Sequence, residues 1–339
     1  MREASRAARG SRAPFEHKYL VREVAAALAA VGAGASYTEA AQLVRVAAWG
    51  EGRRWNRGAA TVVNGALVSE WLTEYGRVVC PPETAWPETL VLDSTEFMYT
   101  DTWSRERYRL FCLMFAYGYP ADGSAPRLWR VASAPSDDTT AWAEFLTGLD
   151  GVPRVVVCDD DGGITAGVRA AWGRKSRVHR CEHHLYMRAR VAFDKDKVAG
   201  DDPLHEQLNE AFRSPEQWRR FREAAAADKR WNVVRWAKRT DKRIAVQLER
   251  RGEVSVYANG AIEAPVRAYR AALERRAWCF RNRRRMDLLL EQMRYHANRA
   301  DTVDSYTTVL RTWLRDHPGA PAGQRTDYDP RGVSSLRGA

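Results

Sequence analysis

Two aspartates follow or interrupt strongly apolar segments, and their types and positions could support metal chemistry. Asp93 lies in LVLDSTEF, where a carboxylate among apolar neighbours is costly unless a cation or a hydrogen-bonding partner compensates for its burial. Asp159 follows the apolar run VVVC and opens the series DDDGG. If the two segments are neighbouring strands of one sheet, the two carboxylates face each other across a gap. Hard oxygen ligands grouped in this way suit Mg²⁺ or Mn²⁺.

The aspartates directly after Asp159 have a simpler interpretation. A run of Asp followed by Gly is also typical of a turn and of a helix N-terminus, where carboxylates accept backbone N–H bonds and favour the positive end of the helix dipole. We favour this capping role for Asp160 and Asp161. For Asp159, at the strand end itself, we favour metal binding.

The elements that must position these acids follow from the apolar pattern. Three β-rich runs, LVLDSTEF, RLFCLMFAYGY and RLWRVASA, predict a meander of strands. After them, DDTTAWAEFLTGL predicts a helix, PRVVVCD a strand, ITAGVRAAW a helix and SRVHRC a short strand. This order of elements is that of the ribonuclease H-like fold, in which a mixed sheet carries acidic residues at strand ends.

Helical segments flank this predicted core. The stretch HKYLVREVAAALAAVGAGASYTEAAQLVRVAAWG predicts helix, turn and helix, and Ser36 with Glu39 has the spacing of a capping box. A third helix is expected at about Thr61 to Tyr75, after the basic segment EGRRWNRG. These elements outline a helix-turn-helix, and a plain three-helix bundle with a basic exposed face is the alternative.

We therefore predict an α/β protein with a ribonuclease H-like core, an all-α insertion and an all-α, helix-turn-helix-like N-terminal domain. Tryptophans recur through the insertion, and we favour a place for them in its core over a base-stacking platform. The predicted segments are a disordered basic arm (1–14), a helical DNA-binding domain (15–80), the first part of the core (88–185), the helical insertion (186–255), the C-terminal helices of the core (256–317) and a disordered tail (318–339).

The composition indicates a globular chain with an anionic partner. Of 339 residues 45% are hydrophobic, and the formal net charge is +11. Such a charge favours a polyanion, because neutralised phosphates release counterions. No apolar run approaches the roughly 18 to 20 residues of a membrane span, and we expect a cytoplasmic, nucleoid-associated protein without a signal peptide. Five scattered cysteines without CxxC spacing do not indicate a disulfide framework or a four-cysteine zinc site.

Four motifs taken together resemble a known family. LVLDSTEF, VVVCDDDGGI, SRVHRCEHHL and ANGAIE are similar, in their order and spacing, to the DDE transposases of bacterial insertion sequences in the Mutator-like superfamily. In that family an Asp ends the first strand, a second Asp follows an apolar strand, a C-x-x-H comes next, and a Glu after an all-helical insertion closes the triad. The resemblance implies Asp93, Asp159 and Glu263 as the catalytic, metal-binding acids, with Cys181 and His184 near the site.

Two positions depart from the family's pattern. The family has Asn three residues before the Glu, whereas Asn259 stands four before Glu263. Glu253 and Glu274 therefore stay open as the third acid, and Glu263 could be a solvated residue at a helix start. The first motif also carries Glu96 where a small or basic residue is common.

The Cys181 and His184 pair has two possible roles. Two candidate ligands are too few for a tetrahedral zinc site. A structural Cys with a hydrogen-bonding His is at least as well supported as direct participation in chemistry.

Arginines are concentrated in two regions. A solvated helix face usually interleaves Glu with Arg, whereas the segment after Glu263 carries many arginines against the single acid Glu274. We expect phosphate contacts there and in the N-terminal region. The predicted DNA-binding residues are Arg53, Arg54, Arg57, Arg275, Arg276, Arg281, Arg283, Arg284 and Arg285.

The activity that the resemblance implies is phosphoryl transfer on double-stranded DNA with two Mg²⁺ or Mn²⁺ ions. A water attacks the phosphodiester at the transposon end, and the freed 3′-hydroxyl then joins target DNA. The implied partners are terminal inverted repeats, target DNA and further copies of the chain in a homo-oligomer. Two alternatives stay open: another ribonuclease H-like nuclease, or a decayed or domesticated transposase that only binds DNA.

Overall fold

A five-stranded mixed sheet lies at the centre of the computed structural model, which describes residues 20–50, 63–159, 161–275 and 282–317. The predicted arm, the predicted tail, Asp160 and the arginines at 53, 54, 57, 276 and 281 lie outside these ranges. The strands are β1 (Thr89–Thr100), β2 (Arg107–Tyr119), β3 (Arg127–Ala134), β4 (Val155–Cys158) and β5 (Arg177–Arg180).

The sheet has the strand order β3-β2-β1-β4-β5. β1 pairs antiparallel with β2 and parallel with β4, while β2–β3 is antiparallel and β4–β5 is parallel. The expected meander and the two later strands are therefore present, and the strands that carry Asp93 and precede Asp159 are neighbours. This confirms the mixed α/β class.

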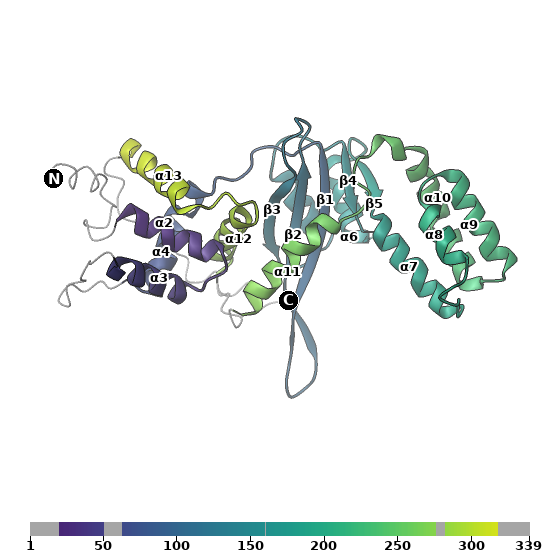
Figure 1. The fold of residues 1–339 in the computed structure, drawn as a ribbon, viewed down its shortest axis with the longest axis horizontal. Helices are drawn as coiled ribbons and strands as arrows, with labels where there is room; N and C mark the ends of the chain where they lie inside the picture. The colour runs from purple at the N-terminus through teal and green to yellow at the C-terminus, as the bar shows by residue number, and fades with distance from the viewer. Residues whose placement is uncertain (1–19, 51–62, 160, 276–281, 318–339) are drawn as a thin grey trace.

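Helices occupy most of the remaining described chain (Figure 1). They are α2 (Val21–Gly32), α3 (Tyr37–Gly50), α4 (Gly65–Val79), α5 (Thr139–Thr147), α6 (Gly162–Trp172), α7 (Glu182–Lys195), α8 (Leu204–Ala211), α9 (Pro215–Ala227), α10 (Trp231–Glu249), the 3₁₀ turn η1 (Arg251–Glu253), α11 (Gly260–Glu274), α12 (Arg283–Ala297) and α13 (Val303–Asp316).

The first strand is longer than its sequence motif suggested. Asp93 was expected near the end of the strand, but β1 continues to Thr100 and pairs with β2 along a long hairpin that projects beyond the other strands (Figure 1). At its tip the Asp101 side chain accepts two backbone N–H bonds, and the Trp103 side chain is 94% exposed. Asp93 therefore lies within β1 rather than at its end.

The two faces of the sheet have separate cores. α5 and α6 cover one face, where Trp142 and Val168 pack against residues such as Leu92 and Val156. α11 and α12 cover the other face, where Val91 and Val157 belong to a core shared with Tyr269. Because side chains alternate along a strand, this second face is also the one to which Asp93 points.

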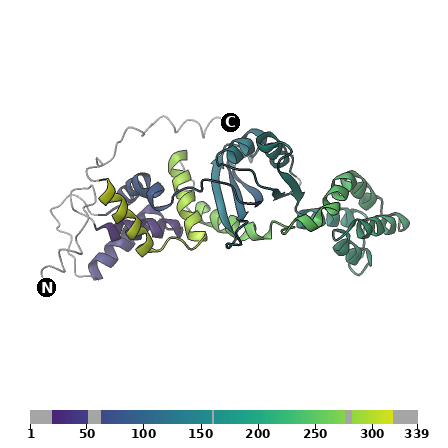
Figure 2. The same ribbon diagram turned by 90° about the horizontal axis from the view of Figure 1, so that it is seen from above.

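The N-terminal helices do not form a body of their own. Sequence reasoning assigned 15–80 to a separate domain, whereas α2 and α4 pack against α12 and α13 from the far end of the chain (Figure 2). Gln292 Nε2 on α12 donates to the Gly76 carbonyl at 3.1 Å, and Cys80 Sγ lies 3.0 Å from the Tyr306 hydroxyl. Apolar faces on α2 and α4 predict burial, but they do not say which helix buries them.

A second helical group, α7 to α10, follows β5 and precedes α11 in the sequence, and it has its own apolar core. Trp218 and Trp236 are buried in it, and their rings lie 5.8 Å apart, which agrees with the expected core role. Trp231, by contrast, is 60% exposed. Within the described residues no helix is long and apolar enough to cross a membrane.

Candidate active site

The parallel pairing of β1 with β4 brings Asp93 close to Asp159. Val91 on β1 pairs with Val157 on β4, and each aspartate lies two residues further along its segment, with Asp159 just past the end of β4. Asp93 points to the face on which Val91 and Val157 pack, and the charge of Asp159 acts on it. The sequence prediction that the strand carrying Asp93 and the strand preceding Asp159 are neighbours is confirmed.

The Asp93 carboxylate is held by two donors. Oδ1 accepts the Ser94 backbone N–H at 2.8 Å, and Oδ2 accepts the Asn259 Nδ2 amide at 3.2 Å. Burial, with a smaller contribution from the nearby charges of Asp159 and Glu263, raises the pKa of Asp93 to about 6 in spite of these two hydrogen bonds. The ionised form of Asp93 is thus disfavoured by burial and by two neighbouring acids.

Asp159 begins the connection to α6. Its Oδ1 accepts the Asp161 backbone N–H at 2.9 Å, and burial raises its pKa while the charges of His184 and Arg188 oppose that rise. Asp161 Oδ1 in turn accepts the Gly163 and Ile164 N–H groups at 2.7 and 3.2 Å as the N-cap of α6. The capping interpretation of Asp161 is confirmed.

Glu263 lies in the first turn of α11. Its charge acts on both Asp93 and His184. A third carboxylate, which follows the helices α7 to α10 in the sequence, is therefore close to the two aspartates. The two reserve glutamates are committed elsewhere: Glu253 pairs with Arg177, and Glu274 lies 3.2 Å from Arg270 on its own helix.

Asn259 joins three elements at the site. It is fully buried immediately before α11, and besides its bond to Asp93 its Oδ1 accepts from Cys181 Sγ at 3.3 Å. The backbone N–H of Asn259 donates back to Cys181 Sγ, also at 3.3 Å. Cys181 precedes α7, and burial raises the pKa of its thiol. Cys181 therefore has a structural role: it fixes the amide that holds Asp93.

His184 faces the acids from the first turn of α7. Burial lowers its pKa, against the attraction of Asp159 and Glu263, and so favours the uncharged form of the ring. Its Nδ1 is buried without a hydrogen-bond partner among the described residues. Arg188, one turn later on α7, adds a positive charge near Asp159. Sequence reasoning missed Arg188, although its spacing of four from His184 places both on one helix face.

Comparison with known proteins adds no family. No family model matches the sequence, and no curated protein matches it significantly. The fold and the site described above therefore carry the functional argument by themselves.

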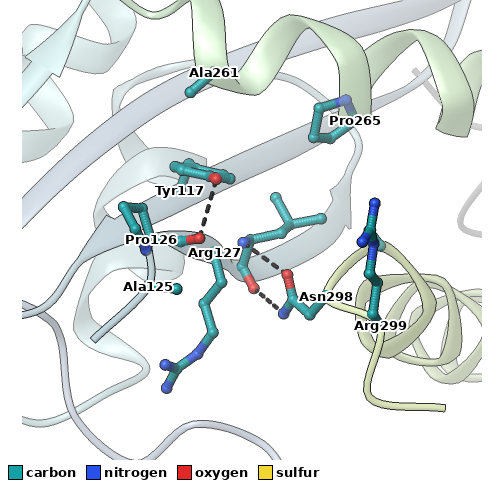
Figure 3. Close-up of a pocket in the computed structure, with 10 residues that line it drawn as sticks. Tyr117, Ala125, Pro126, Arg127, Ala261, Pro265, Asn298 and Arg299 are labelled. Carbon is teal, nitrogen blue, oxygen red and sulfur yellow. Dashed lines mark hydrogen bonds between the residues drawn. The ribbon is translucent and has the colours of Figure 1, made fainter. Parts of the chain in front are cut away.

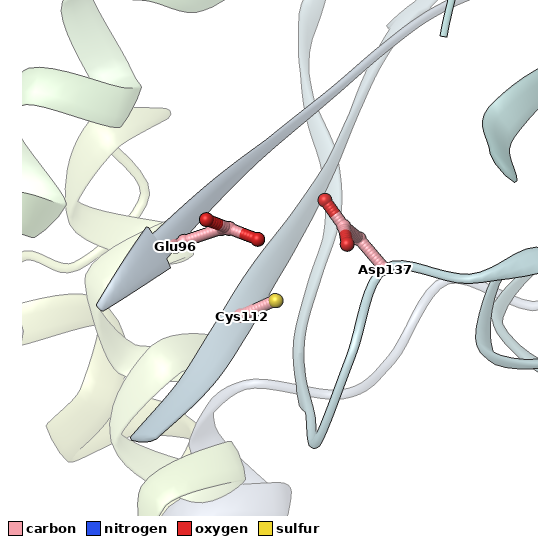
Figure 4. Close-up of side chains that lie close together, drawn as sticks. All are labelled: Glu96, Cys112 and Asp137. Atoms are coloured by element: carbon pink, nitrogen blue, oxygen red, sulfur yellow. The ribbon is translucent and has the colours of Figure 1, made fainter. Parts of the chain in front are cut away.

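A second acidic group lies on the opposite face of β1 and β2. Ligand atoms of Glu96, Cys112 and Asp137 come within 4.8 Å of one another (Figure 4), a spacing that Asp93, Asp159 and Glu263 do not meet. Arg109 pairs with Glu96 and lies 3.7 Å from Asp137. The guanidinium therefore already supplies the counter-charge of this group. Glu96, the departure in the first motif, belongs to this ion pair.

The described arginines of the C-terminal cluster differ in what they contact. Arg283 donates to the Ser133 carbonyl at 2.9 Å and ties α12 to β3, and Arg275 Nε donates to the Ala271 carbonyl of its own helix at 3.2 Å. Arg284 is exposed and Arg285 half-buried, and both make further interactions. Arg283 therefore has a structural contact in addition to the phosphate contact expected from the sequence.

A hollow of about 380 Å³ lies away from the acids, between the turn after β2 and the helices α11 and α12 (Figure 3). Asn298 braces one wall, since its side chain exchanges two hydrogen bonds with the Leu128 backbone at 3.0 and 2.8 Å. None of the predicted site residues that the structure describes lines it.

Proposed function

We propose that this chain is a DDE-type transposase that cleaves and transfers DNA strands at transposon inverted repeats. One observation carries the proposal: Asp159, just past the end of the strand that pairs with β1, and Glu263, from a helix beyond an all-α insertion, both raise the pKa of Asp93 on β1. Acids from separate segments that meet on one face of a sheet mark a candidate catalytic centre.

The architecture supports a ribonuclease H-like core. Along the chain, three strands are followed by a helix, a strand, a helix and a strand, which is the order expected from the sequence, and in the sheet β1 lies between β2 and β4. The helices α7 to α10 between β5 and α11 correspond to the expected insertion. A transposase of this kind differs from a simple nuclease of the same fold by such an insertion and by the N-terminal helices.

The three carboxylates fit a divalent metal cofactor, Mg²⁺ or Mn²⁺. They supply hard oxygen donors, and the pKa values of Asp93 and Asp159 are raised by burial, so a cation would relieve a charge repulsion that Arg188 offsets only in part. Asp93, Asp159 and Glu263 would hold it. When bound, such a metal activates water and stabilises the leaving oxygen of a phosphodiester.

The surrounding residues have positioning roles in this proposal. Asn259 orients the Asp93 carboxylate, and the α6 N-terminus fixes Asp159 through the Asp161 N–H. The neutral His184 ring with its unpartnered Nδ1 can hydrogen-bond a phosphate oxygen or accept a proton, and Arg188 can offset the phosphate charge.

DNA is the proposed partner because the chain is strongly basic outside the acidic centre. The formal net charge is +11. The N-terminal helices α2 to α4 are the proposed reader of the inverted repeats, and a homo-oligomer would bring two transposon ends together. The capping box that opens α3 is formed, with Ser36 and Glu39 exchanging hydrogen bonds at 2.7 and 3.2 Å.

A cleavage and joining assay tests this function. The purified chain is incubated with duplex DNA that carries the inverted repeats flanking its gene, in Mg²⁺, Mn²⁺ or EDTA. Metal-dependent 3′-end cleavage followed by joining to a second duplex is the expected result. Cleavage of any duplex without joining would replace the proposal with a nuclease, and binding without cleavage in either metal would leave a DNA-binding protein.

A further inference from the structure

A cationic groove lies at the end of the sheet opposite to the three acids. Arg154 directly precedes β4 and Arg177 begins β5, whereas Asp159 and Cys181 follow the other ends of these strands. The groove has a volume of about 660 Å³. Its cationic lining residues are Arg154, Arg169, Arg174, Lys175, Arg177 and Arg250.

The groove continues along α10. An adjoining hollow of about 320 Å³ shares Arg169, Arg177 and Arg250 with it and adds cations from the next turns of α10 and from β5. Among the described residues no Asp or Glu lines either hollow. Two of the arginines have acidic partners at the margin, Glu88 at 2.9 Å from Arg154 and Glu253 beside Arg177. The lining is therefore far from neutral.

An unpartnered hydroxyl lies in the same groove. Ser176 is 1% exposed and lines the groove, yet its Oγ has no hydrogen-bond partner in the described structure. A buried hydroxyl left unpaired costs free energy, whereas a bridging water would satisfy it. Such a water would link the hydroxyl to a phosphate oxygen held by the surrounding cations.

We propose that this groove binds the phosphate backbone of duplex DNA, independently of sequence, at a distance from the phosphate that is cut. Within the described part of the chain no Phe, Tyr or Trp lines it, so the lining offers no stacking platform of the kind that single-stranded nucleic acid needs. Arginine and lysine contacts to phosphates position a duplex without reading bases. The inference that the bound duplex is a substrate of this chain rests on the proposed function.

The distance between groove and acids follows from the short strands. β4 and β5 have four residues each. At about 3.3 Å per residue they separate the two ends of the sheet by about 13 Å, which equals about four base pairs of duplex. The part of the groove around Arg154, Arg174 and Lys175 thus holds a different phosphate from the one that the acids face.

Salt-dependent binding of a random-sequence duplex to the full chain tests the groove. The variant Arg174→Ala with Lys175→Ala removes two exposed cations from the turn between α6 and β5. Across about 50 to 200 mM salt, the slope of log K against log salt should fall by about 1.8 in magnitude, since each phosphate contact contributes about 0.9. The control, Lys195→Ala with Lys229→Ala, changes the net charge equally at exposed positions of the insertion and should keep the wild-type slope.

Ser176→Ala is the second variant, because it removes the hydroxyl without changing charge. It should weaken duplex binding roughly five-fold while the salt slope stays unchanged. Wild-type slopes in the Arg174 and Lys175 variant, or equal losses in the control, would overturn the proposal. If the Arg174 and Lys175 variant lost binding to a hairpin RNA but bound duplex DNA as the wild type does, the proposal would also be overturned, in favour of an RNA partner.

The groove and the acids can fail separately in these measurements. Binding that depends on the groove, together with a wild type that never cleaves inverted repeats, supports the groove and removes the transposase. Cleavage by the wild type, together with unchanged binding by the groove variants, supports the transposase and removes the groove.

Discussion

Asn259 Nδ2 donates to Asp93 Oδ2 at 3.2 Å, which links the start of α11 to the middle of β1. The same amide accepts from the buried Cys181 thiol in front of α7. Three segments that lie far apart in sequence thus meet at one carboxylate. The position of Asn259, four residues before Glu263, is a departure from the family pattern that still leaves the amide in contact with the first aspartate.

Removal of this amide should loosen the site. Asn259→Ala leaves the Cys181 thiol without its acceptor and deprives Asp93 of a bond that lowers its pKa. We expect a loss of about 1–3 kcal/mol in unfolding free energy and an upward shift in the pKa of Asp93. Urea denaturation and carboxyl NMR titration measure the two effects. Wild-type stability together with an unchanged Asp93 titration would contradict the role given to Asn259.

The raised pKa of Asp93 makes stability depend on pH. Its pKa is about 6 in the folded chain against an ordinary value of 3.8, so the folded state binds the proton more tightly. The stabilisation from protonated Asp93 is fully present below about pH 3.8 and is lost as pH rises through about 6, at most about 3 kcal/mol. Asp93→Asn should therefore be more stable than the wild type at pH 8. A pH series of unfolding free energies that shows equal slopes for both proteins between pH 4 and 6 would refute this.

Divalent metal should relieve the same repulsion. With Mg²⁺ or Mn²⁺ at about 100 times its dissociation constant, ligand binding adds about 2.7 kcal/mol to the wild type. The melting temperature should rise with metal in the wild type and far less in Asp159→Asn. As a control, Asp137→Asn alters the second acidic group and should keep the metal response. A metal response lost in Asp137→Asn and kept in Asp159→Asn would place the ion at the second acidic group and contradict metal binding by Asp159.

The packing of α13 on the N-terminal helices predicts a large mutational effect at its buried face. Leu310 is 1% exposed and lies against Val21, Val24 and Tyr75. Leu310→Ala should cost about 2–5 kcal/mol. The neighbouring Val309 is 39% exposed, and Val309→Ala should cost well under half as much. Equal costs at the two positions, measured by denaturant unfolding, would show that α13 does not stabilise these helices.

Local sequence patterns predicted the elements that carry the acids, because alternation, turn residues and caps act over a few residues. The apolar runs around Asp93 and before Asp159 became neighbouring strands, and the capping box predicted from Ser36 and Glu39 is formed at the start of α3. Long-range partnerships were not predictable in the same way. Nothing local to Arg283 shows that its guanidinium contacts the Ser133 carbonyl, and an apolar face on α4 does not identify α12 as its partner.

In the proposed function, Asp93, Asp159 and Glu263 act together as one metal-dependent centre. The most direct measurement is 3′-end cleavage of inverted-repeat duplex in Mg²⁺ by Asp93→Asn, Asp159→Asn and Glu263→Gln, with Glu253→Gln and Glu274→Gln as matched controls. The account predicts that each of the first three variants loses at least about 10³-fold in rate, while both controls cleave at close to the wild-type rate. Normal cleavage by Glu263→Gln, with loss in either control, would contradict the assignment of the third acid.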